Sequence, residues 1–470
     1  TISLIGTTVD SAYVQARQTT PVPAFTKVSI SGQGDVVADA DAAVALYANL
    51  SQQAKLVASD AGANDFLGYS VDIKGDYAIV GATGEKAAYV FTRSGTTWSQ
   101  QAKIAYNEGA FGTAVALSTD TNYAIIGSFY AGGGGARVYL RSGTSWSQQA
   151  ILAPSDRASN DEYGTSVSIS SDGTYAVVAG MGDDSYKGAA VVFIRSGTSW
   201  SQQAKITEPA RETGARFGAA AKLNDAGNVL ACSSPTSDEA TGNAGAVFVF
   251  TRSGTTWSWQ SDLVASDAGG SDYMGDTVSG QGVNGTTDIN EAGTLVVAGA
   301  YGHNSGGIGN AGAAYVWKYN GSSWSQVTKL TAPSNVLNEN YGEAVAISGN
   351  TIVVGQDNAG GGGANAKAYV YTTADESTWT LAKTFTASDV AAYLEFGFSV
   401  AIDNAGSIIV GAKGTANQTG STGQAYVFTA PMGVMLEDTL TLEAGSGITL
   451  TTTAGTDTVT IAGSAAGLDS

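Results

Sequence analysis

The chain has 470 residues, of which 62 are glycine, and only 13% are charged, with 22 Lys and Arg against 41 Asp and Glu. Its 43% hydrophobic content is too high for a disordered chain, and no apolar run approaches the ~18–20 residues of a membrane-spanning helix. The formal net charge of −19 argues against nucleic acid and anionic lipid as partners, because it repels their phosphates.

Residues 1–42 precede an internal repeat and are predicted to form an N-terminal linker or extension. From residue 43 to residue 430, one unit recurs seven times. Each copy begins with an aromatic or large apolar residue followed by glycine. These pairs are Leu67-Gly68, Phe111-Gly112, Tyr163-Gly164, Phe217-Gly218, Met274-Gly275, Tyr341-Gly342 and Phe396-Gly397.

Each unit contains four short runs with the pattern of β-strands. Apolar and polar residues alternate in the first run, and the second ends in small residues, as in Tyr77-Ala-Ile-Val-Gly-Ala82. A third run and a turn such as Arg93-Ser-Gly-Thr-Thr-Trp98 lead into the fourth. Four strands in each of seven units predict an all-β fold, a seven-bladed β-propeller with almost no helix. A solenoid is the competing architecture, but a closed ring removes exposed strand edges.

The two ends of the repeat region predict how the ring closes. Six units carry a tryptophan at the start of the fourth run, at Trp98, Trp146, Trp200, Trp257, Trp324 and Trp379. The seventh unit lacks this run, but Ser51-Gln-Gln-Ala-Lys-Leu56 matches Ser99-Gln-Gln-Ala-Lys-Ile104, with Leu50 in the tryptophan position. We therefore expect residues 43–57 to complete the last blade by pairing the N- and C-terminal segments.

The recurrent tryptophans are expected to pack in the core or between blades, since each occupies the same place in its unit. Trp259 and Trp317 lie off that position and are candidates for contact with a partner or ligand, such as a sugar.

Residues that occur once limit the chemistry. Cys232 is the only cysteine, so there is no intrachain disulfide and no cysteine metal cluster. His303 is the only histidine, which excludes a multi-histidine zinc site, and it lies in a glycine-rich loop where an ordinary structural role is expected. No pair of carboxylates is placed in one cleft by the sequence alone. These features predict a protein that is not an enzyme and needs no cofactor.

The pairing of Phe-Gly with a later Gly-Ala resembles the FG-GAP repeat of the propeller in integrin α-chain heads, over about residues 43–430. In that family, some blades bind calcium through an Asp-x-Asp/Asn-x-Asp-Gly loop between the first and second strands. The closest turn here is Asp288-Ile-Asn-Glu-Ala-Gly293, in which Ala292 replaces an expected acid. The resemblance makes Asp288 and Asn290 candidate calcium ligands, with a plain hairpin turn as the alternative.

A second acidic pattern recurs before the Phe-Gly element. It reads Ser59-Asp-Ala-Gly-Ala-Asn-Asp65, Ser155-Asp-Arg-Ala-Ser-Asn-Asp161 and Ser266-Asp-Ala-Gly-Gly-Ser-Asp272. Such Ser and Asp residues commonly cap turns through hydrogen bonds to the nearby backbone, which is the expected role. Cation binding and partner recognition are the alternatives.

Residues 431–470 follow the repeat, and from Asp438 to Ile461 threonine alternates with Leu, Val and Ile, which predicts two or three strands. This segment resembles the glycine- and threonine-rich modules of marine bacteriophage tail-fibre and other virion proteins, which commonly trimerise. Val9-Asp-Ser-Ala-Tyr-Val-Gln-Ala-Arg-Gln18 is similar to a linker phrase in structural proteins of phages that infect marine cyanobacteria. We expect the 470 residues to be part of a longer polypeptide.

These resemblances imply a non-enzymatic component of an external virion appendage, such as a tail fibre, that displays the propeller for attachment to a host. Its expected partners are other virion proteins and a host-surface glycan or protein, and it is expected to be a homotrimer without membrane insertion. Recognition is expected from loops 280–291 and 301–311. Two alternatives are a calcium-dependent adhesin of a bacterial surface and a polysaccharide-degrading propeller in which two carboxylates converge.

Overall fold

The computed structural model describes residues 50–107, 109–129, 132–210, 212–276, 286–357, 366–389, 394–414 and 422–429 in full. In the flanks it describes the backbone of six strands, β1 (Ser3–Ile5), β2 (Tyr13–Gln15), β3 (Val28–Ile30), β4 (Val36–Ala38), β33 (Ile448–Thr453) and β34 (Thr458–Gly463). The chain divides into two compact units. One is Leu50–Pro431, and the other combines Thr1–Asn49 with Met432–Ser470.

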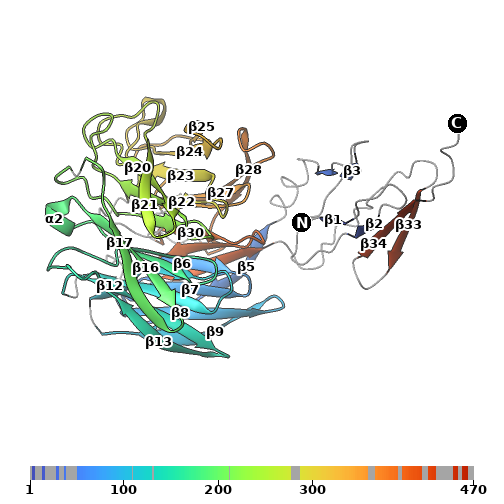
Figure 1. Cartoon of the computed structure of the whole chain (residues 1–470), viewed down its shortest axis with the longest axis horizontal. Helices are drawn as coiled ribbons and strands as arrows, with labels where there is room; N and C mark the ends of the chain where they lie inside the picture. The colour runs from blue at the N-terminus through green and yellow to red at the C-terminus, as the bar shows by residue number, and fades with distance from the viewer. Residues whose placement is uncertain are drawn as a thin grey trace. The chain divides into compact units, whose positions relative to one another are not determined.

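The unit Leu50–Pro431 is a seven-bladed β-propeller of four-stranded antiparallel sheets, as predicted (Figure 1). From the inner to the outer strand, blade 1 is β6 (Leu67–Lys74), β7 (Tyr77–Ala82), β8 (Ala87–Ser94) and β9 (Thr97–Ala105). Blade 2 is β10 (Ala110–Leu117), β11 (Tyr123–Phe129), β12 (Gly135–Ser142) and β13 (Ser145–Leu152). Blade 3 is β14 (Ser166–Ile169), β15 (Tyr175–Gly180), β16 (Ala189–Ser196) and β17 (Ser199–Ile206).

The remaining blades have the same strand order. Blade 4 is β18 (Ala221–Leu223), β19 (Val229–Ser234), β20 (Ala246–Ser253) and β21 (Thr256–Leu263). Blade 5 is β22 (Thr287–Ile289), β23 (Leu295–Ala300), β24 (Ala313–Tyr319) and β25 (Trp324–Leu330). Blade 6 is β26 (Ala344–Ser348), β27 (Thr351–Gln356), β28 (Lys367–Thr373) and β29 (Trp379–Phe385). Blade 7 is β30 (Phe396–Ile402), β31 (Ile408–Ala412), β32 (Gln424–Thr429) and β5 (Ser51–Leu56).

The ring closes through β5, which confirms the predicted pairing of the two ends. β5 pairs antiparallel with β32, from Leu56 opposite Ala425 to Ser51 opposite Thr429. The strand lies in the second half of the predicted segment 43–57, and residues 43–49 are outside the described residues. The last blade is thus built from the first and last strands of the unit.

The Phe-Gly and Gly-Ala motifs join neighbouring blades. Gly112 has a φ of 93°, which favours glycine, and a Cβ on it would lie 2.4 Å from the carbonyl oxygen of Ala87 in blade 1. A Cβ on Gly81 of blade 1 would lie 2.1 Å from the carbonyl oxygen of Gly112. The two motifs therefore recur together because they meet across the interface between blades. In blade 4, Ser233 takes the second position, and its hydroxyl donates to the Gly275 carbonyl at 3.0 Å.

The recurrent tryptophans lie on the outer strands and link adjacent blades there. Five indole N–H groups of the described residues donate to a glutamine on the outer strand of the preceding blade. The pairs are Trp98 with Gln53, Trp146 with Gln101, Trp200 with Gln149, Trp257 with Gln203 and Trp324 with Gln260. Val327 occupies the glutamine position facing Trp379, whose buried indole N–H has no hydrogen-bond partner in the part of the chain that the structure describes.

The two faces of the propeller differ in their connections. Each link from first to second strand, and each link from third to fourth strand in blades 1–6, spans two to five residues. We call this side the hairpin face. The opposite side, the variable face, carries links from second to third strands that range from 83–86 to 301–312, and links between blades that range from 106–109 to 264–286. The chain enters at Ser51 and leaves at Thr429 on the hairpin face.

The described residues of the second unit are six strands. Strands β1, β2, β34 and β33 form one antiparallel sheet in that order, and β3 pairs with β4. The C-terminal segment thus contributes two strands, as the threonine pattern predicted, and N-terminal strands complete their sheet.

Candidate functional site

A polar cluster recurs on the variable face. In four blades of the described part, a lysine of the outer strand forms an ion pair with the first aspartate of the loop that leads into that blade. The pairs are Lys103 with Asp60 at 2.6 Å, Lys205 with Asp156 at 2.7 Å, Lys329 with Asp267 at 2.7 Å and Lys55 with Asp389 at 2.5 Å. We call these arrangements the lysine clusters of blades 1, 3, 5 and 7.

The second aspartate of the same loop shapes its turn. Asp65, Asp161 and Asp272 each accept the backbone N–H of the residue three positions earlier, at 2.5, 2.6 and 2.7 Å. The predicted turn role is therefore confirmed for these residues. The first aspartate is held by the lysine, and no group of three or more His, Cys, Asp or Glu among the described residues could hold a metal ion.

A third side chain comes from the loop between the second and third strands. In this loop a glycine N–H donates to the carbonyl of the second aspartate. The pairs are Gly84 with Asp65 at 3.1 Å, Gly182 with Asp161 at 3.1 Å and Gly302 with Asp272 at 3.2 Å. The residue that follows the glycine differs between blades and contacts the lysine. It is Glu85 in blade 1, Asp183 in blade 3 and His303 in blade 5.

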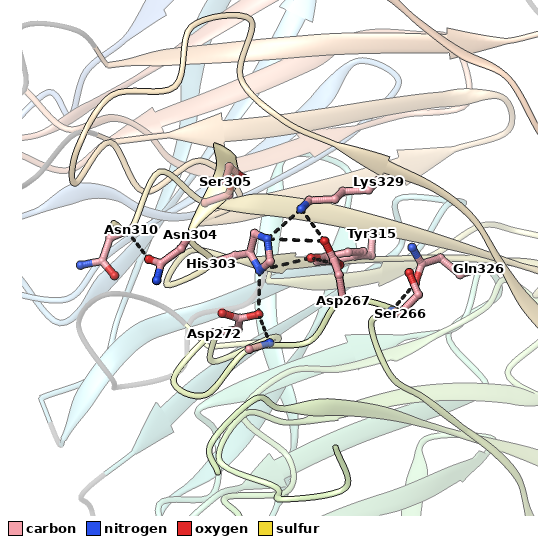
Figure 2. A network of polar contacts seen from close by, with 12 residues as sticks. Ser266, Asp267, Asp272, His303, Asn304, Ser305, Asn310, Tyr315, Gln326 and Lys329 are labelled. Atoms are coloured by element: carbon pink, nitrogen blue, oxygen red, sulfur yellow. Dashed lines mark hydrogen bonds and ion pairs between the residues drawn. The ribbon is translucent and has the colours of Figure 1, made fainter. Parts of the chain in front are cut away.

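His303 closes the lysine cluster of blade 5 (Figure 2). Its Nδ1 lies 2.7 Å from Oδ2 of Asp272, and its Nε2 lies 2.7 Å from the ammonium of Lys329. An ammonium can only donate, so Nε2 accepts and the proton lies on Nδ1, where it is donated to Asp272. The Tyr315 hydroxyl donates to Asp267 at 2.8 Å, and His303 is only 7% exposed. The histidine thus has the structural role expected for it, with both ring nitrogens engaged.

Blade 3 has the same backbone hydrogen bonds as blade 5, but Asp183 takes the place of His303. Lys205 donates to Oδ1 of Asp183 at 2.8 Å, and the hydroxyl of Tyr163 donates to the same oxygen at 3.0 Å. Burial opposes the charge of Lys205, but its hydrogen bonds to Asp156 and Asp183 outweigh this and raise its pKa. Val191 stands on β16 where blade 5 has Tyr315 on β24.

A cavity of about 730 Å³ opens over the lysine cluster of blade 3. We call it the blade-3 pocket. It is lined by the loop from Asp156 to Asp161, by the turn from Gly182 to Tyr186, and by Lys205 and Thr207. Within that turn Asp184, Ser185 and Tyr186 have positive φ values of 48°, 64° and 62°. Most of the lining residues are polar, and Ala158, Gly182 and the side chain of Tyr186 add apolar surface. Tyr186 is 45% exposed.

The candidate calcium ligands Asp288 and Asn290 lie at the hairpin end of β22, and their oxygens are engaged by backbone donors. Asn290 Oδ1 accepts the N–H groups of Thr294 and Leu295 at 2.8 and 3.0 Å. Asp288 Oδ2 accepts the N–H of Ile347 in blade 6 at 2.9 Å, and burial raises its pKa. The geometry therefore supports the alternative of a structured turn and an inter-blade contact.

Asp288 also faces the central channel, which is lined by residues from all seven inner strands. Two lysines share this channel. Carboxylates including Asp72 offset the burial of Lys74 and raise its pKa, whereas burial lowers the pKa of Lys222. The opposite shifts show that the described carboxylates balance one lysine better than the other.

The two off-repeat tryptophans have opposite environments. Trp259 on β21 is 52% exposed and stays a candidate for contact with a partner. Trp317 on β24 is 2% exposed and packs among buried residues of blades 4 and 5, including Tyr315. The expectation that Trp317 meets a ligand is wrong, because it occupies a core-facing position of the third strand. Of the predicted recognition loops, 301–311 lies on the variable face. In the predicted loop 280–291, residues 280–285 are outside the described residues. Thr287–Ile289 form the inner strand β22, and 290–291 lie in the hairpin turn after it, so that part of the prediction is wrong.

Sequence reasoning did not find Asp183, Lys205 and Tyr186 as a group. One signal was present, since the loops that begin with Ser-Asp precede outer strands that carry lysine. Blade 2 has Ile151 in the lysine position and a four-residue loop at 106–109. This joint occurrence predicts the ion pair, but not the cavity.

Comparison with known protein families matches the FG-GAP repeat at residues 50–95, 146–193, 324–371 and 379–428. Each matched segment begins within one residue of the start of an outer strand and runs into the third strand of the next blade. A search of curated proteins gave no match. Among the described residues, no helix has the length and apolarity needed to span a membrane. The chain therefore carries FG-GAP repeats on a seven-bladed β-propeller.

Proposed function

We propose that this chain is a non-enzymatic component of a virion appendage and that its variable face recognises the surface of a host cell. The observation that carries the proposal is the asymmetry of the two faces. Loop variation is confined to one face, while the chain connections at Ser51 and Thr429 lie on the other. Loops on a rigid scaffold commonly carry binding function.

Exposed apolar side chains support the choice of face. Large exposed apolar residues of the described part lie on variable-face loops or on outer strands. The first group is Val57, Tyr186, Val336 and Leu337, and the second is Ile151, Trp259 and Leu381. Apolar groups in adaptable loops are available for contact with a partner.

The virion part of the proposal rests on the two flanking segments and their resemblance to phage structural proteins. The flanks contribute strands to one sheet, β1-β2-β34-β33, which fits a connecting or oligomerising element. We expect a homotrimer. Native mass spectrometry of the full chain tests this, and a monomer would contradict it.

The test of recognition uses fluorescently labelled full chain and a panel of marine cyanobacterial cells. The double variant Val336→Asp/Leu337→Asp alters the variable face, and Ile151→Asp is the matched control on an outer strand. We expect at least tenfold weaker cell binding for the double variant and unchanged binding for the control. Equal binding by all three proteins would overturn the choice of face.

The same system tests the other parts of the proposal. Antibodies against the chain should label virions in electron micrographs, and labelling of bacterial cells alone would contradict the virion assignment. Loss of cell binding in a calcium chelator would favour the adhesin alternative. Release of reducing sugar from host polysaccharide would overturn the non-enzymatic assignment.

A further inference from the structure

We propose that the blade-3 pocket binds a neutral, hydroxyl-rich ligand, namely one sugar unit of a surface glycan. The inference rests on the proposed role in surface recognition and names its ligand class and one site. It starts from a comparison of two positions that share a backbone framework, Asp183 in blade 3 and His303 in blade 5.

The first step is a buried acceptor without a donor. Asp183 is 4% exposed, and its Oδ1 accepts hydrogen bonds from both Lys205 and Tyr163. Asp183 lines the pocket, and its buried Oδ2 has no hydrogen-bond partner among the described residues. An unsatisfied buried carboxylate oxygen is costly, and native proteins rarely leave one. A ligand that donates a hydrogen bond would satisfy it.

The second step is the charge of the donor. The ammonium of Lys205 lies 2.8 Å from Asp183, so a second cation at this carboxylate would be repelled. An anionic ligand would be repelled by Asp156, Asp161 and Asp184, which also line the pocket. A hydroxyl group donates without bringing charge, and it can also accept from nearby donors such as Asn160.

The third step is the exposed ring of Tyr186. Three consecutive residues with positive φ form the turn that carries it, and such backbone costs free energy in residues other than glycine. The Tyr186 N–H donates to the Gly182 carbonyl at 3.1 Å, and its own carbonyl accepts from Arg216 at 2.8 Å. The turn thus holds an aromatic ring at the rim of a polar cavity. A sugar ring has hydroxyl edges for the cavity and an apolar C–H face for the tyrosine.

The experiment screens the full chain against immobilised neutral, amino and acidic sugars, then titrates the best neutral oligosaccharide by calorimetry. We expect binding to a neutral sugar. Asp183→Asn keeps an acceptor for Lys205 but alters the free oxygen, and it should weaken binding about 10- to 100-fold. Tyr186→Ala should weaken binding about tenfold through loss of ring packing.

Two matched controls lie on the outer strand of blade 4. Trp259→Ala removes another exposed aromatic ring, and Asp262→Asn makes the same change as Asp183→Asn at a carboxylate outside the pocket. Both should leave the affinity within about twofold. If Asp183→Asn unfolds, the comparison of Tyr186→Ala with Trp259→Ala decides whether the blade-3 pocket binds the sugar.

The result that overturns the inference is distinct from failure of the proposed function. Preference for amino or acidic sugars, loss of binding only in Trp259→Ala, or no sugar binding at all would each overturn it. If cell binding by the variable face persists in those cases, surface recognition stands and the blade-3 pocket is not its sugar site. If cell binding is also absent, the proposed function fails as well.

Discussion

Blades 3 and 5 place different side chains at one equivalent position, with opposite results. In blade 5, the buried His303 bridges Asp272 and Lys329. In blade 3, Asp183 binds Lys205 through one oxygen, and a cavity of about 730 Å³ remains above it. The surrounding ties, from the glycine N–H to the second aspartate and from lysine to the first aspartate, are the same in both.

The difference shows that the residues at the centre of the site can change while the surrounding contacts, which we call the framework, stay the same. The framework is a set of backbone and ion-pair contacts repeated by the sequence. The centre depends on the residue after glycine and on the position of a tyrosine, which is Tyr315 on the third strand in blade 5 and Tyr163 in the Phe-Gly motif in blade 3. A binding site can therefore arise in one blade without disturbing its neighbours.

The largest expected effect concerns the ring that holds both blades in place. Deletion of residues 1–56 removes β5, so the last blade loses its outer strand and β32 is left with an unpaired edge. We expect loss of the cooperative unfolding transition, measured by calorimetry and amide hydrogen exchange. Deletion of residues 1–49 is the control and should keep the transition. Independent, unchanged folding of blades 3 and 5 after the larger deletion would contradict this.

The next largest effect is a difference in stability between alanine variants of the two central residues, His303 in blade 5 and Asp183 in blade 3. His303→Ala leaves Asp272 and Lys329 without their shared partner in a buried site, which should cost about 2–4 kcal/mol. Asp183→Ala leaves Lys205 and the Tyr163 hydroxyl without their shared acceptor, but it also removes a carboxylate oxygen that has no donor, so it should cost less, about 1–2 kcal/mol. Urea unfolding of both variants measures the difference. Equal costs would contradict the difference between the two positions that their contacts indicate.

Removal of the tyrosine hydroxyls in blades 3 and 5 should have smaller effects on stability. Tyr163→Phe removes a donor from buried Asp183 and should destabilise the fold by about 1–2 kcal/mol. Tyr315→Phe removes a donor from Asp267, whose side chain is 48% exposed, so water can replace it and the cost should be about 0.5 kcal/mol. Tyr89→Phe, which affects the matching bond to Asp60, is the control for Tyr315→Phe. A larger effect at Tyr315 would reverse the expected order.

The smallest effect is a dependence on acidity in blade 3. The hydrogen bond to Lys205 lowers the pKa of Asp156, so its contribution to stability is present above about pH 4 and is lost as the pH falls through the folded pKa. Burial raises the pKa of Asp161, so the folded state takes up that proton first and gains stability on acidification.

Two variants test these opposite signs. Between about pH 5 and pH 3, Asp156→Asn should lose stability less steeply than the unmodified chain, and Asp161→Asn more steeply. Chemical unfolding at several pH values measures the slopes. The same slope in both variants would contradict the assignment.

Much of the fold could be predicted because its signals repeat. Seven Phe-Gly pairs, the alternating runs and the match between Ser51–Leu56 and Ser99-Gln-Gln-Ala-Lys-Ile104 predicted the blade number, the strand order and the closure. Repetition works here because each motif makes one contact between blades, and the same contact must recur around the ring.

The site was less predictable because it depends on departures from the repeat. Trp317 was predicted to contact a ligand because it lies outside the recurrent tryptophan position. Its side chain on β24 faces the core instead. Asp183 belongs to the candidate site because it lies close to Lys205 and Tyr163 in the folded chain. These residues are 22 and 20 positions away in sequence. The absence of a donor for its second oxygen is a property of the assembled loops and has no sequence motif.

The most direct test of the comparison between blades is a crystal structure of the full chain soaked with the neutral sugar that binds best in solution. We predict sugar density in the blade-3 pocket, with a ligand hydroxyl at Asp183 Oδ2 and the sugar ring against Tyr186. The matching position in blade 5 should show His303 between Asp272 and Lys329 and no sugar. Sugar bound elsewhere, with only water in the blade-3 pocket, would contradict this account.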